Sequence, residues 1–142
     1  MIRKRPIRLR DAPLRARLEA ARRAGEALPS VEIGGYRVAL GSVDNRLYVT
    51  RADESRGRVY LGRVDSGGFR PRREVVKGDI EVIRALVEQP LETAARAATL
   101  AVEMGIPVRC LCCGRPLGDR SKLKGIGPGC FESWGWEKWP NE

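Results

Sequence analysis

All four cysteines of the chain lie in one short stretch, CLCCGRPLGDRSKLKGIGPGC, which runs from Cys110 to Cys130. Cys110 and Cys113 form a C-x-x-C pair followed directly by Gly114, and Cys130 comes after a gap of 16 residues. A C-x-x-C turn directs two thiolates toward one ion, and glycine can adopt the positive φ that closes such a turn. The gap falls within the range of C-x-x-C…C-x-x-C zinc sites. We therefore predict a structural zinc with Cys110, Cys113 and Cys130 as ligands.

The fourth ligand of this site stays open. Ser133 stands where the pattern would place Cys or His, and the chain contains no histidine. The fourth donor is therefore Cys112, Asp119, Glu132 or water. The alternatives to a metal are a disulfide pair or four free thiols. An open coordination position would suit a catalytic zinc, but such a site needs a general base. Because the commonest base, histidine, is absent, we expect no enzymatic activity.

The cysteine stretch resembles a small domain family of unknown function that is common in phage and bacterial proteins. Its hallmark is C-x-x-C-G-R-x-L, a short polar segment with Asp and Ser, and then G-x-G-P-x-C. The matching residues here are Cys110, Cys113, Gly114, Arg115, Leu117, Asp119, Ser121, Gly125, Gly127, Pro128 and Cys130. The resemblance covers residues 107–142. It implies a zinc-finger-like fold, often appended to DNA-processing proteins of phages, and therefore suggests a phage-encoded protein.

The length and composition of the chain bound the remaining possibilities. With 142 residues, of which 42% are hydrophobic, the chain can bury one modest core. No apolar run is long enough to span a membrane. The basic start, MIRKR, lacks the apolar region of a secretory signal. We therefore expect a cytoplasmic protein without membrane contact, in which clustered cysteines favour a metal over disulfides.

The positive charge of the chain is concentrated near its start. The net charge is +9, and residues 1–30 carry nine basic and three acidic side chains. Such an excess is typical of a phosphate-binding element, and we expect DNA or RNA as the partner. A solubilising tail or the arginine bias of a GC-rich genome is the alternative. The candidate nucleic-acid-binding residues are Arg3, Lys4, Arg5, Arg8, Arg10, Arg15, Arg22, Arg115, Lys122 and Lys124.

Breaks in the sequence pattern predict three parts. Residues 1–11 read as a flexible basic arm, because Pro6 disrupts regular structure. Residues 12–106 form an α+β domain, and residues 107–142 form the zinc-binding module. Within the domain, Asp11 is the predicted N-cap of an amphipathic, basic helix over residues 12–27.

The middle of the chain predicts a small antiparallel β-meander of three or four strands. Apolar residues alternate over 36–40, 47–50 and 59–64, with a loop over 51–57 and a possible edge strand at 69–70. The polar side chains of these strands include Arg37, Arg63 and Arg70, with Tyr48 or Tyr60 beside them. They would suit single-stranded nucleic acid, although a solvated sheet face is the interpretation we favour here.

Two further helices are expected after the meander. Asp79 is the predicted cap of the first helix, Pro90 separates the two, and alanines form a close-packing stripe on the second. Gly105 is the predicted terminator of the second helix. Together with the metal module, these elements give an α+β fold.

Three tryptophans close the sequence: Trp134, Trp136 and Trp139. They either cover the small zinc knuckle or remain exposed as partner-binding anchors. The function we favour is a non-enzymatic nucleic-acid-binding accessory protein with a structural zinc module. The alternative is a protein-interaction module that docks on a host polymerase, nuclease or defence complex through its tryptophan-rich end.

Overall fold

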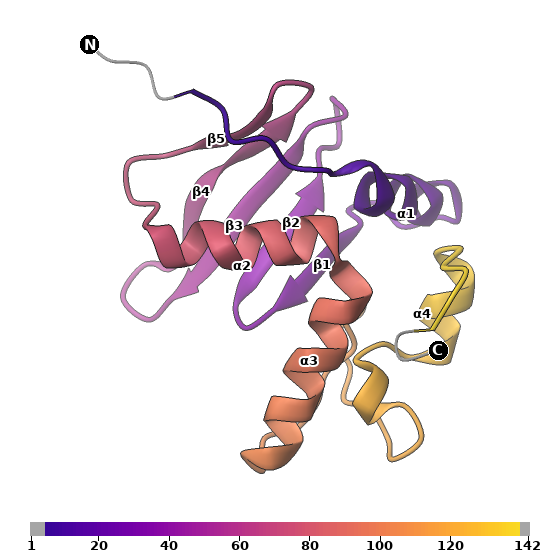
Figure 1. The fold of residues 1–142 in the computed structure, drawn as a ribbon. Helices are drawn as coiled ribbons and strands as arrows, with labels where there is room; N and C mark the ends of the chain where they lie inside the picture. Colours follow the sequence, from indigo (N-terminus) through magenta and orange to yellow (C-terminus); the bar gives the residue numbers. More distant parts are fainter. Residues whose placement is uncertain (1–4, 140–142) are drawn as a thin grey trace.

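The computed structural model describes residues 5–139 and is organised around one antiparallel sheet with five strands in sequence order. The strands are β1 (Ser30–Ile33), β2 (Tyr36–Leu40), β3 (Leu47–Asp53), β4 (Gly57–Asp65) and β5 (Gly68–Pro71). Each strand pairs with the next through a short connection, as in a meander (Figure 1). The structure thus confirms the predicted α+β class and the meander.

Two details of the predicted meander are wrong. The sheet has five strands rather than three or four, because the sequence pattern does not predict β1. This strand is only four residues long, and Val31 is its one buried side chain. It is held by pairing with β2 across a two-residue turn, in which Gly34 and Gly35 both have positive φ. The predicted loop over 51–57 is also shorter, since β3 continues through charged residues to Asp53.

Helices α1 (Ala12–Arg23) and α2 (Lys77–Glu88) lie on one face of the sheet (Figure 1). Leu14 and Leu18 of α1 and Ile83 of α2 are fully buried, at the spacing that the sequence indicates. Helix α1 ends at Arg23 rather than at the predicted residue 27, because the chain turns at Gly25 with a φ of 110°. Helix α3 (Pro90–Glu103) follows directly and leads away from the sheet.

Asp79 is a buried polar link between α2 and the sheet, with 2% of its surface exposed. It lies in the first turn of α2 rather than at the N-cap, and its carboxylate accepts the N–H of Val76 at 3.0 Å. It also accepts the Tyr36 hydroxyl at 2.5 Å and the Arg51 guanidinium at 2.8 Å. Burial alone would raise the pKa of Asp79, but these hydrogen bonds and the charge of Arg51 outweigh it and lower the pKa.

Both edges of the sheet are partly covered by segments distant in sequence. At the β5 edge, Ile7 and Phe69 exchange backbone hydrogen bonds of 2.8 and 2.7 Å. The predicted arm is therefore held against the sheet at Ile7. At the β1 edge, the N–H of Glu32 donates to the carbonyl of Leu111 at 3.0 Å.

The C-terminal segment contains the short 3-10 helix η1 (Lys122–Lys124) and helix α4 (Pro128–Ser133). Its side chains Leu111, Ile126 and Trp134 belong to the same hydrophobic cluster as the inner face of the sheet. The predicted zinc module therefore has no separate core. In the described part of the chain, we find no helix that is both long and apolar enough to cross a membrane.

Candidate metal centre

The C-x-x-C pair lies at the end of a short β-like hairpin. Arg109 and Pro116 face each other across it, and the N–H of Cys110 donates to the carbonyl of Arg115 at 2.9 Å. The N–H of Gly114 donates to the carbonyl of Cys110 at 2.9 Å, and Gly114 has a φ of 72°. The positive φ is what lets the chain reverse directly after the second cysteine, as the sequence predicts.

The third cysteine comes from a second segment that packs closely on α3. Gly125 has a φ of 73°, and a Cβ atom there would lie 2.5 Å from the carbonyl oxygen of Ala94. Only glycine therefore allows this approach. The chain then enters α4 with Pro128 at the first position, which places Cys130 in the first turn.

These two segments bring three sulfur atoms together. The Sγ atoms of Cys110, Cys113 and Cys130 lie within 4.8 Å of one another. Cys110 is buried, Cys130 is half-buried and Cys113 is exposed, so the cluster opens to the surface on one side. All four cysteines, which fall within the described residues, are free thiols. The cluster could hold a metal ion, as the spacing predicts.

Hydrogen bonds favour the thiolate form at two of the three sulfurs. The pKa of Cys110 is lowered to about 4, chiefly because the Cys112 thiol donates to its sulfur. Burial opposes this effect, and the N–H of Gly127, 3.3 Å from Cys110 Sγ, supports it. The pKa of Cys130 is lowered mainly by the same Cys112 thiol. Burial and the neighbouring Cys110 sulfur raise the pKa of Cys113 to about 11, so binding a metal would release its proton.

The structure separates the candidates for a fourth ligand. The side chain of Asp119 is 97% exposed and forms an ion pair with Lys122 at 3.3 Å. Glu132 is also exposed, and neither carboxylate joins the sulfur cluster. Cys112 lies outside the group of three, but its thiol contacts the sulfurs of Cys110 and Cys130. Of the three candidate side chains for the fourth ligand, Cys112 is therefore the one adjacent to the sulfur cluster.

The structure does not gather the sequence-predicted basic residues on one surface. Of those near the start, Arg3 and Lys4 lie outside the described residues, and Arg5, Arg8 and Arg10 are exposed. Arg15 forms an ion pair with Asp11 at 2.8 Å, and Arg22 donates to the carbonyl of Leu40 at 3.3 Å. Arg15 also donates to the carbonyl of Asn45 in the turn before β3, so Arg15 and Arg22 both link α1 to the sheet.

The C-terminal segment lies beside α1 and apart from residues 5–10 (Figure 1), and Arg17 of α1 donates to the carbonyl of Trp134 at 3.3 Å. Arg115 is exposed, whereas Lys122 pairs with Asp119. The Lys124 ammonium lies 4.1 Å from the centre of the Trp139 ring. The two predicted groups of cations thus form separate surfaces.

The three C-terminal tryptophans have different environments. Trp134 is 4% exposed and belongs to the hydrophobic core, so it is not available as a docking anchor. Trp139 is half-buried and stacks on Phe131 with ring centres 3.8 Å apart. Trp136 is also half-buried and packs against the core. All three tryptophans therefore contact the core, and Trp136 and Trp139 each remain partly exposed.

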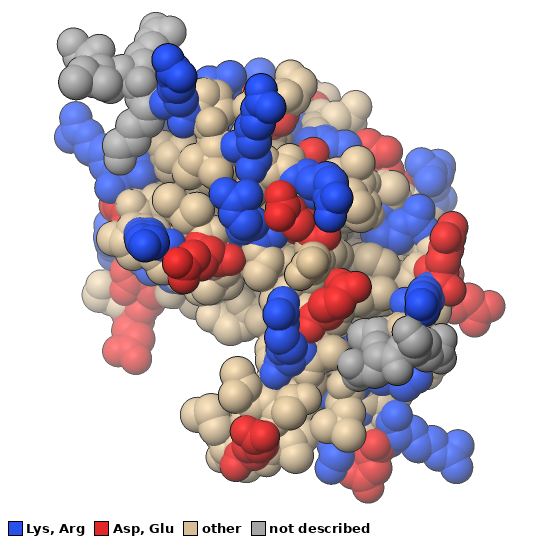
Figure 2. Space-filling view, in the orientation of Figure 1, with Lys and Arg blue, Asp and Glu red and all other residues tan. Residues whose placement is uncertain are grey.

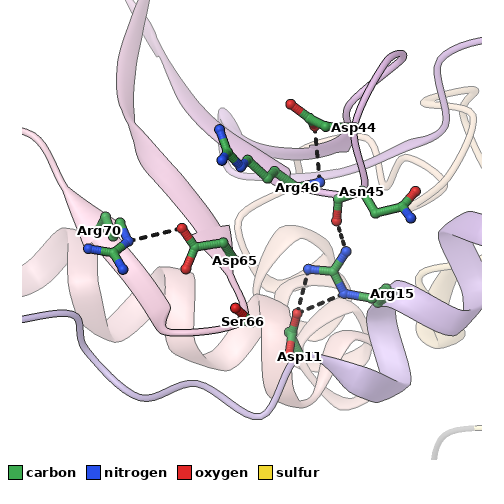
Figure 3. A pocket seen from close by; sticks show the side chains of 8 residues that line it. All are labelled: Asp11, Arg15, Asp44, Asn45, Arg46, Asp65, Ser66 and Arg70. Carbon is green, nitrogen blue, oxygen red and sulfur yellow. Dashed lines mark hydrogen bonds and ion pairs between the residues drawn. The ribbon is translucent and has the colours of Figure 1, made fainter.

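A polar hollow that the sequence did not indicate lies between the start of α1 and the turns beside β3 and β5 (Figure 3). Its charged side chains are three aspartates and three arginines: Asp11, Asp44, Asp65, Arg15, Arg46 and Arg70. Arg15 pairs with Asp11, and Arg70 pairs with Asp65 at 2.9 Å. Because positive and negative groups balance, the hollow has no preference for a charged ligand of one sign.

No family model, curated protein or solved structure matches this chain. The resemblance of residues 110–130 to a phage and bacterial domain family therefore stays a prediction.

Proposed function

We propose that this protein is a non-enzymatic nucleic-acid-binding accessory protein whose C-terminal segment is held by a structural zinc ion. The observation that carries the metal part is the convergence of three cysteine sulfurs within 4.8 Å from two segments. The nucleic-acid part is carried by the net charge of +9 together with exposed arginines on the N-terminal segment.

Zinc suits the sulfur cluster better than other common ions do. Thiolates select zinc over magnesium and calcium, which prefer oxygen ligands. The ion would join the hairpin that carries Cys110 and Cys113 to the start of α4 with Cys130. Its role here is to fix the two segments relative to each other, since the hairpin tip at Cys113 and Gly114 is exposed and has little core of its own.

The distribution of charge supports a polyanionic partner. Arg5, Arg8 and Arg10 are exposed and close in sequence, and no acidic residue lies between them in the chain. On the side that bears the helices, Lys and Arg are interspersed with Asp and Glu (Figure 2). Such a mixed surface attracts phosphates weakly. We therefore place the contact with nucleic acid on the N-terminal segment and on the sheet surfaces next to it. This segment runs beside α2, where Arg84 donates to the carbonyl of Arg8 at 3.1 Å and Glu88 accepts the N–H of Arg10 at 2.8 Å.

Two measurements on the purified full chain test this function. Elemental analysis should find about one zinc per chain. Fluorescence anisotropy with labelled DNA and RNA should show binding that weakens as salt rises. The expected slope of log affinity against log salt is about −0.7 to −0.9 for each phosphate contacted. The absence of stoichiometric metal would overturn the metal proposal, and binding that is absent or insensitive to salt would overturn the nucleic-acid proposal.

A further inference from the structure

The face of the sheet opposite the helices carries a set of basic and aromatic side chains. Helices α1 and α2 cover only the other face (Figure 1). Because side chains alternate along each strand, the positions between the buried ones point together to the uncovered face. Tyr36 and Arg51 are polar but point to the helix side, where they bond Asp79. We call this surface the open sheet face and define it by Arg37, Tyr48, Arg58, Tyr60, Arg63 and Arg70.

Strand register arranges these side chains in continuous rows across the sheet. In the strand register, Arg70 lies opposite Arg63, and Arg63 lies opposite Tyr48 on the next strand. In the neighbouring row, Tyr60 lies opposite Thr50, and Thr50 lies opposite Arg37. The first row therefore combines one aromatic ring with two guanidinium groups, and the second combines one ring with one guanidinium.

The aromatic part of the open sheet face offers a stacking platform. The rings of Tyr48 and Tyr60 lie 6.3 Å apart between centres, and Tyr60 is 37% exposed. The guanidinium of Arg72 lies 5.5 Å from the centre of the Tyr60 ring. An exposed ring next to a guanidinium is the arrangement on which unpaired bases stack in proteins that bind single strands.

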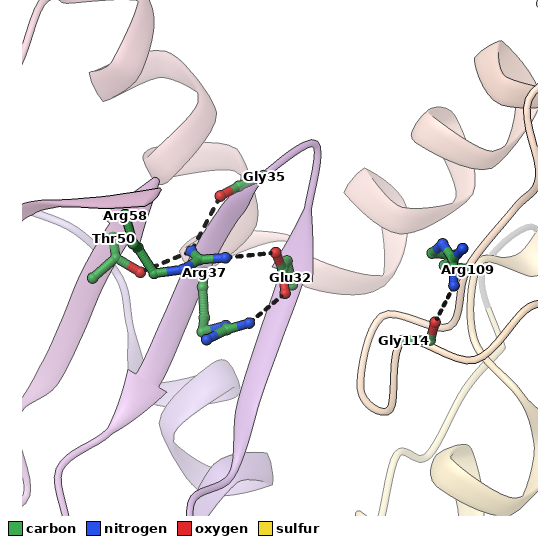
Figure 4. A network of polar contacts seen from close by, with 7 residues as sticks. All are labelled: Glu32, Gly35, Arg37, Thr50, Arg58, Arg109 and Gly114. Atoms are coloured by element: carbon green, nitrogen blue, oxygen red, sulfur yellow. Dashed lines mark hydrogen bonds and ion pairs between the residues drawn. The ribbon is translucent and has the colours of Figure 1, made fainter. Parts of the chain in front are cut away.

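Glu32 neutralises only part of the charge at one end of this face. It accepts Arg37 at 2.9 Å and Arg58 at 3.0 Å, and Arg58 also donates to Thr50 at 3.0 Å (Figure 4). Burial raises the pKa of Glu32, but the hydrogen bonds and charges of Arg37 and Arg58 outweigh it and lower the pKa. Two arginines share one carboxylate, so one positive charge remains in surplus.

The same arrangement recurs at the other end of the face. Asp65 lies 2.9 Å from the Arg70 guanidinium and 3.5 Å from that of Arg63. Arg72 forms no ion pair with any residue that the structure describes, and it is exposed. Asp44, which accepts the Tyr48 hydroxyl at 2.7 Å, adds a third carboxylate, and Asp65 and Arg70 also line the polar hollow. The carboxylates hold the guanidiniums in place, but they are fewer than the arginines and leave the face positive, as a phosphate-binding surface requires.

We propose that the open sheet face binds one single-stranded polynucleotide, whose phosphates contact the arginines and whose bases stack on Tyr60. This inference rests on the proposed nucleic-acid-binding function and names its substrate class. A duplex does not fit this surface, because its bases are stacked on each other and cannot reach a tyrosine ring. The pairing of Ile7 with Phe69 places the exposed Arg8 next to the β5 edge, which extends the positive surface toward the N-terminal segment.

The test compares variants in anisotropy titrations with a labelled oligothymidylate of about 15 nucleotides. Tyr60→Ala should weaken binding by about fivefold or more, whereas Tyr60→Phe keeps the ring and should bind within about twofold of the wild type. Arg72→Ala should weaken binding and reduce the salt slope by about 0.7. Arg96→Ala is the matched control, because Arg96 is exposed on α3, away from the sheet.

The outcomes separate this inference from the proposed function. If neither single strands nor duplex bind the wild type, the nucleic-acid-binding function itself falls. If the wild type binds a single strand but Tyr60→Ala and Arg72→Ala bind as tightly as Arg96→Ala, only the open sheet face is overturned. The same loss with oligouridylate would support the proposal, since stacking does not depend on the sugar. Melting curves check that each variant folds. If Tyr60→Ala does not fold, the binding of Arg72→Ala decides whether the open sheet face is the binding surface.

Discussion

Replacement of Asp79 by alanine tests how the polar link between α2 and the sheet contributes to stability. The carboxylate is buried and accepts three hydrogen bonds, from Tyr36, Arg51 and Val76. Its removal leaves the hydroxyl of the half-buried Tyr36, the backbone N–H of the exposed Val76 and one guanidinium without their acceptor. The Arg51 side chain is 31% exposed, so water replaces part of the lost interaction.

We expect this substitution to lower the free energy of unfolding by about 3 kcal/mol. Breaking a fully buried ion pair costs about 3–5 kcal/mol, and the exposure of Arg51 places this case at the lower end. For a chain of this size, about 3–4 °C in melting temperature corresponds to 1 kcal/mol. The melting temperature of Asp79→Ala should therefore fall by about 10 °C.

The dependence on pH provides a second check. The pKa of Asp79 is lowered from 3.8 in the folded protein, so its stabilising effect is present above that value. The effect is lost as the pH falls through the lower, folded-state pKa. The difference in unfolding free energy between wild type and Asp79→Ala should therefore be constant near neutral pH and shrink below about pH 4.

The assay is urea unfolding at a series of pH values, followed by circular dichroism. Asp119→Ala is the control, because Asp119 is 97% exposed and contacts only Lys122 among the ion pairs that the structure describes. Its effect should stay within about 0.5 kcal/mol. A loss below about 1 kcal/mol for Asp79→Ala, or a difference that does not change between neutral and acid pH, would refute the assigned role of this carboxylate.

Two further predictions concern the C-terminal segment. Gly125→Ala should destabilise the protein by about 1–3 kcal/mol in thermal melts, because the new Cβ would meet the Ala94 carbonyl at a positive φ. Gly129→Ala, where a Cβ meets nothing within 4 Å, is the matched control and should be neutral. Cys113→Ser should abolish stoichiometric metal in elemental analysis, whereas Cys112→Ser should retain metal with weaker binding. Equal loss in both cysteine variants would show that the ligand assignment is wrong.

Much of the fold was predictable because its strands and helices carry regular apolar periods. Val38 and Leu40, or Leu14 and Leu18, point to the core at the spacing of their element. Strand β1 escaped prediction because four residues are too few for a period, and its existence depends on pairing with β2. The Gly34-Gly35 pair between residues 33 and 36 is the local hairpin signal that could have indicated this strand.

The cysteine cluster was predictable for a different reason, since ligand spacing and turn glycines are local properties. The hydrogen-bond partners of the basic residues could not be predicted from the sequence. Arg15 and Arg22 read as free cations in the sequence, yet their acceptors on Asn45, Leu40 and Gly41 belong to other elements brought near by folding. The sequence suggested a nucleic-acid-binding sheet face only as the less favoured interpretation of these residues. The sharing of one carboxylate by two arginines depends on strand register, which the sequence pattern does not give.

The covering of the two sheet edges has a consequence for association between chains. An uncovered edge strand presents unpaired N–H and C=O groups that can recruit a strand from another molecule. Here the N–H of Glu32 donates to the Leu111 carbonyl at one edge. At the other edge, the backbone N–H and C=O groups of Phe69 bond those of Ile7. Leu111 stands between two of the clustered cysteines, so displacement of this hairpin would uncover β1. The cysteine hairpin thus occupies one donor on the β1 edge and leaves fewer groups free to pair with a strand of another molecule.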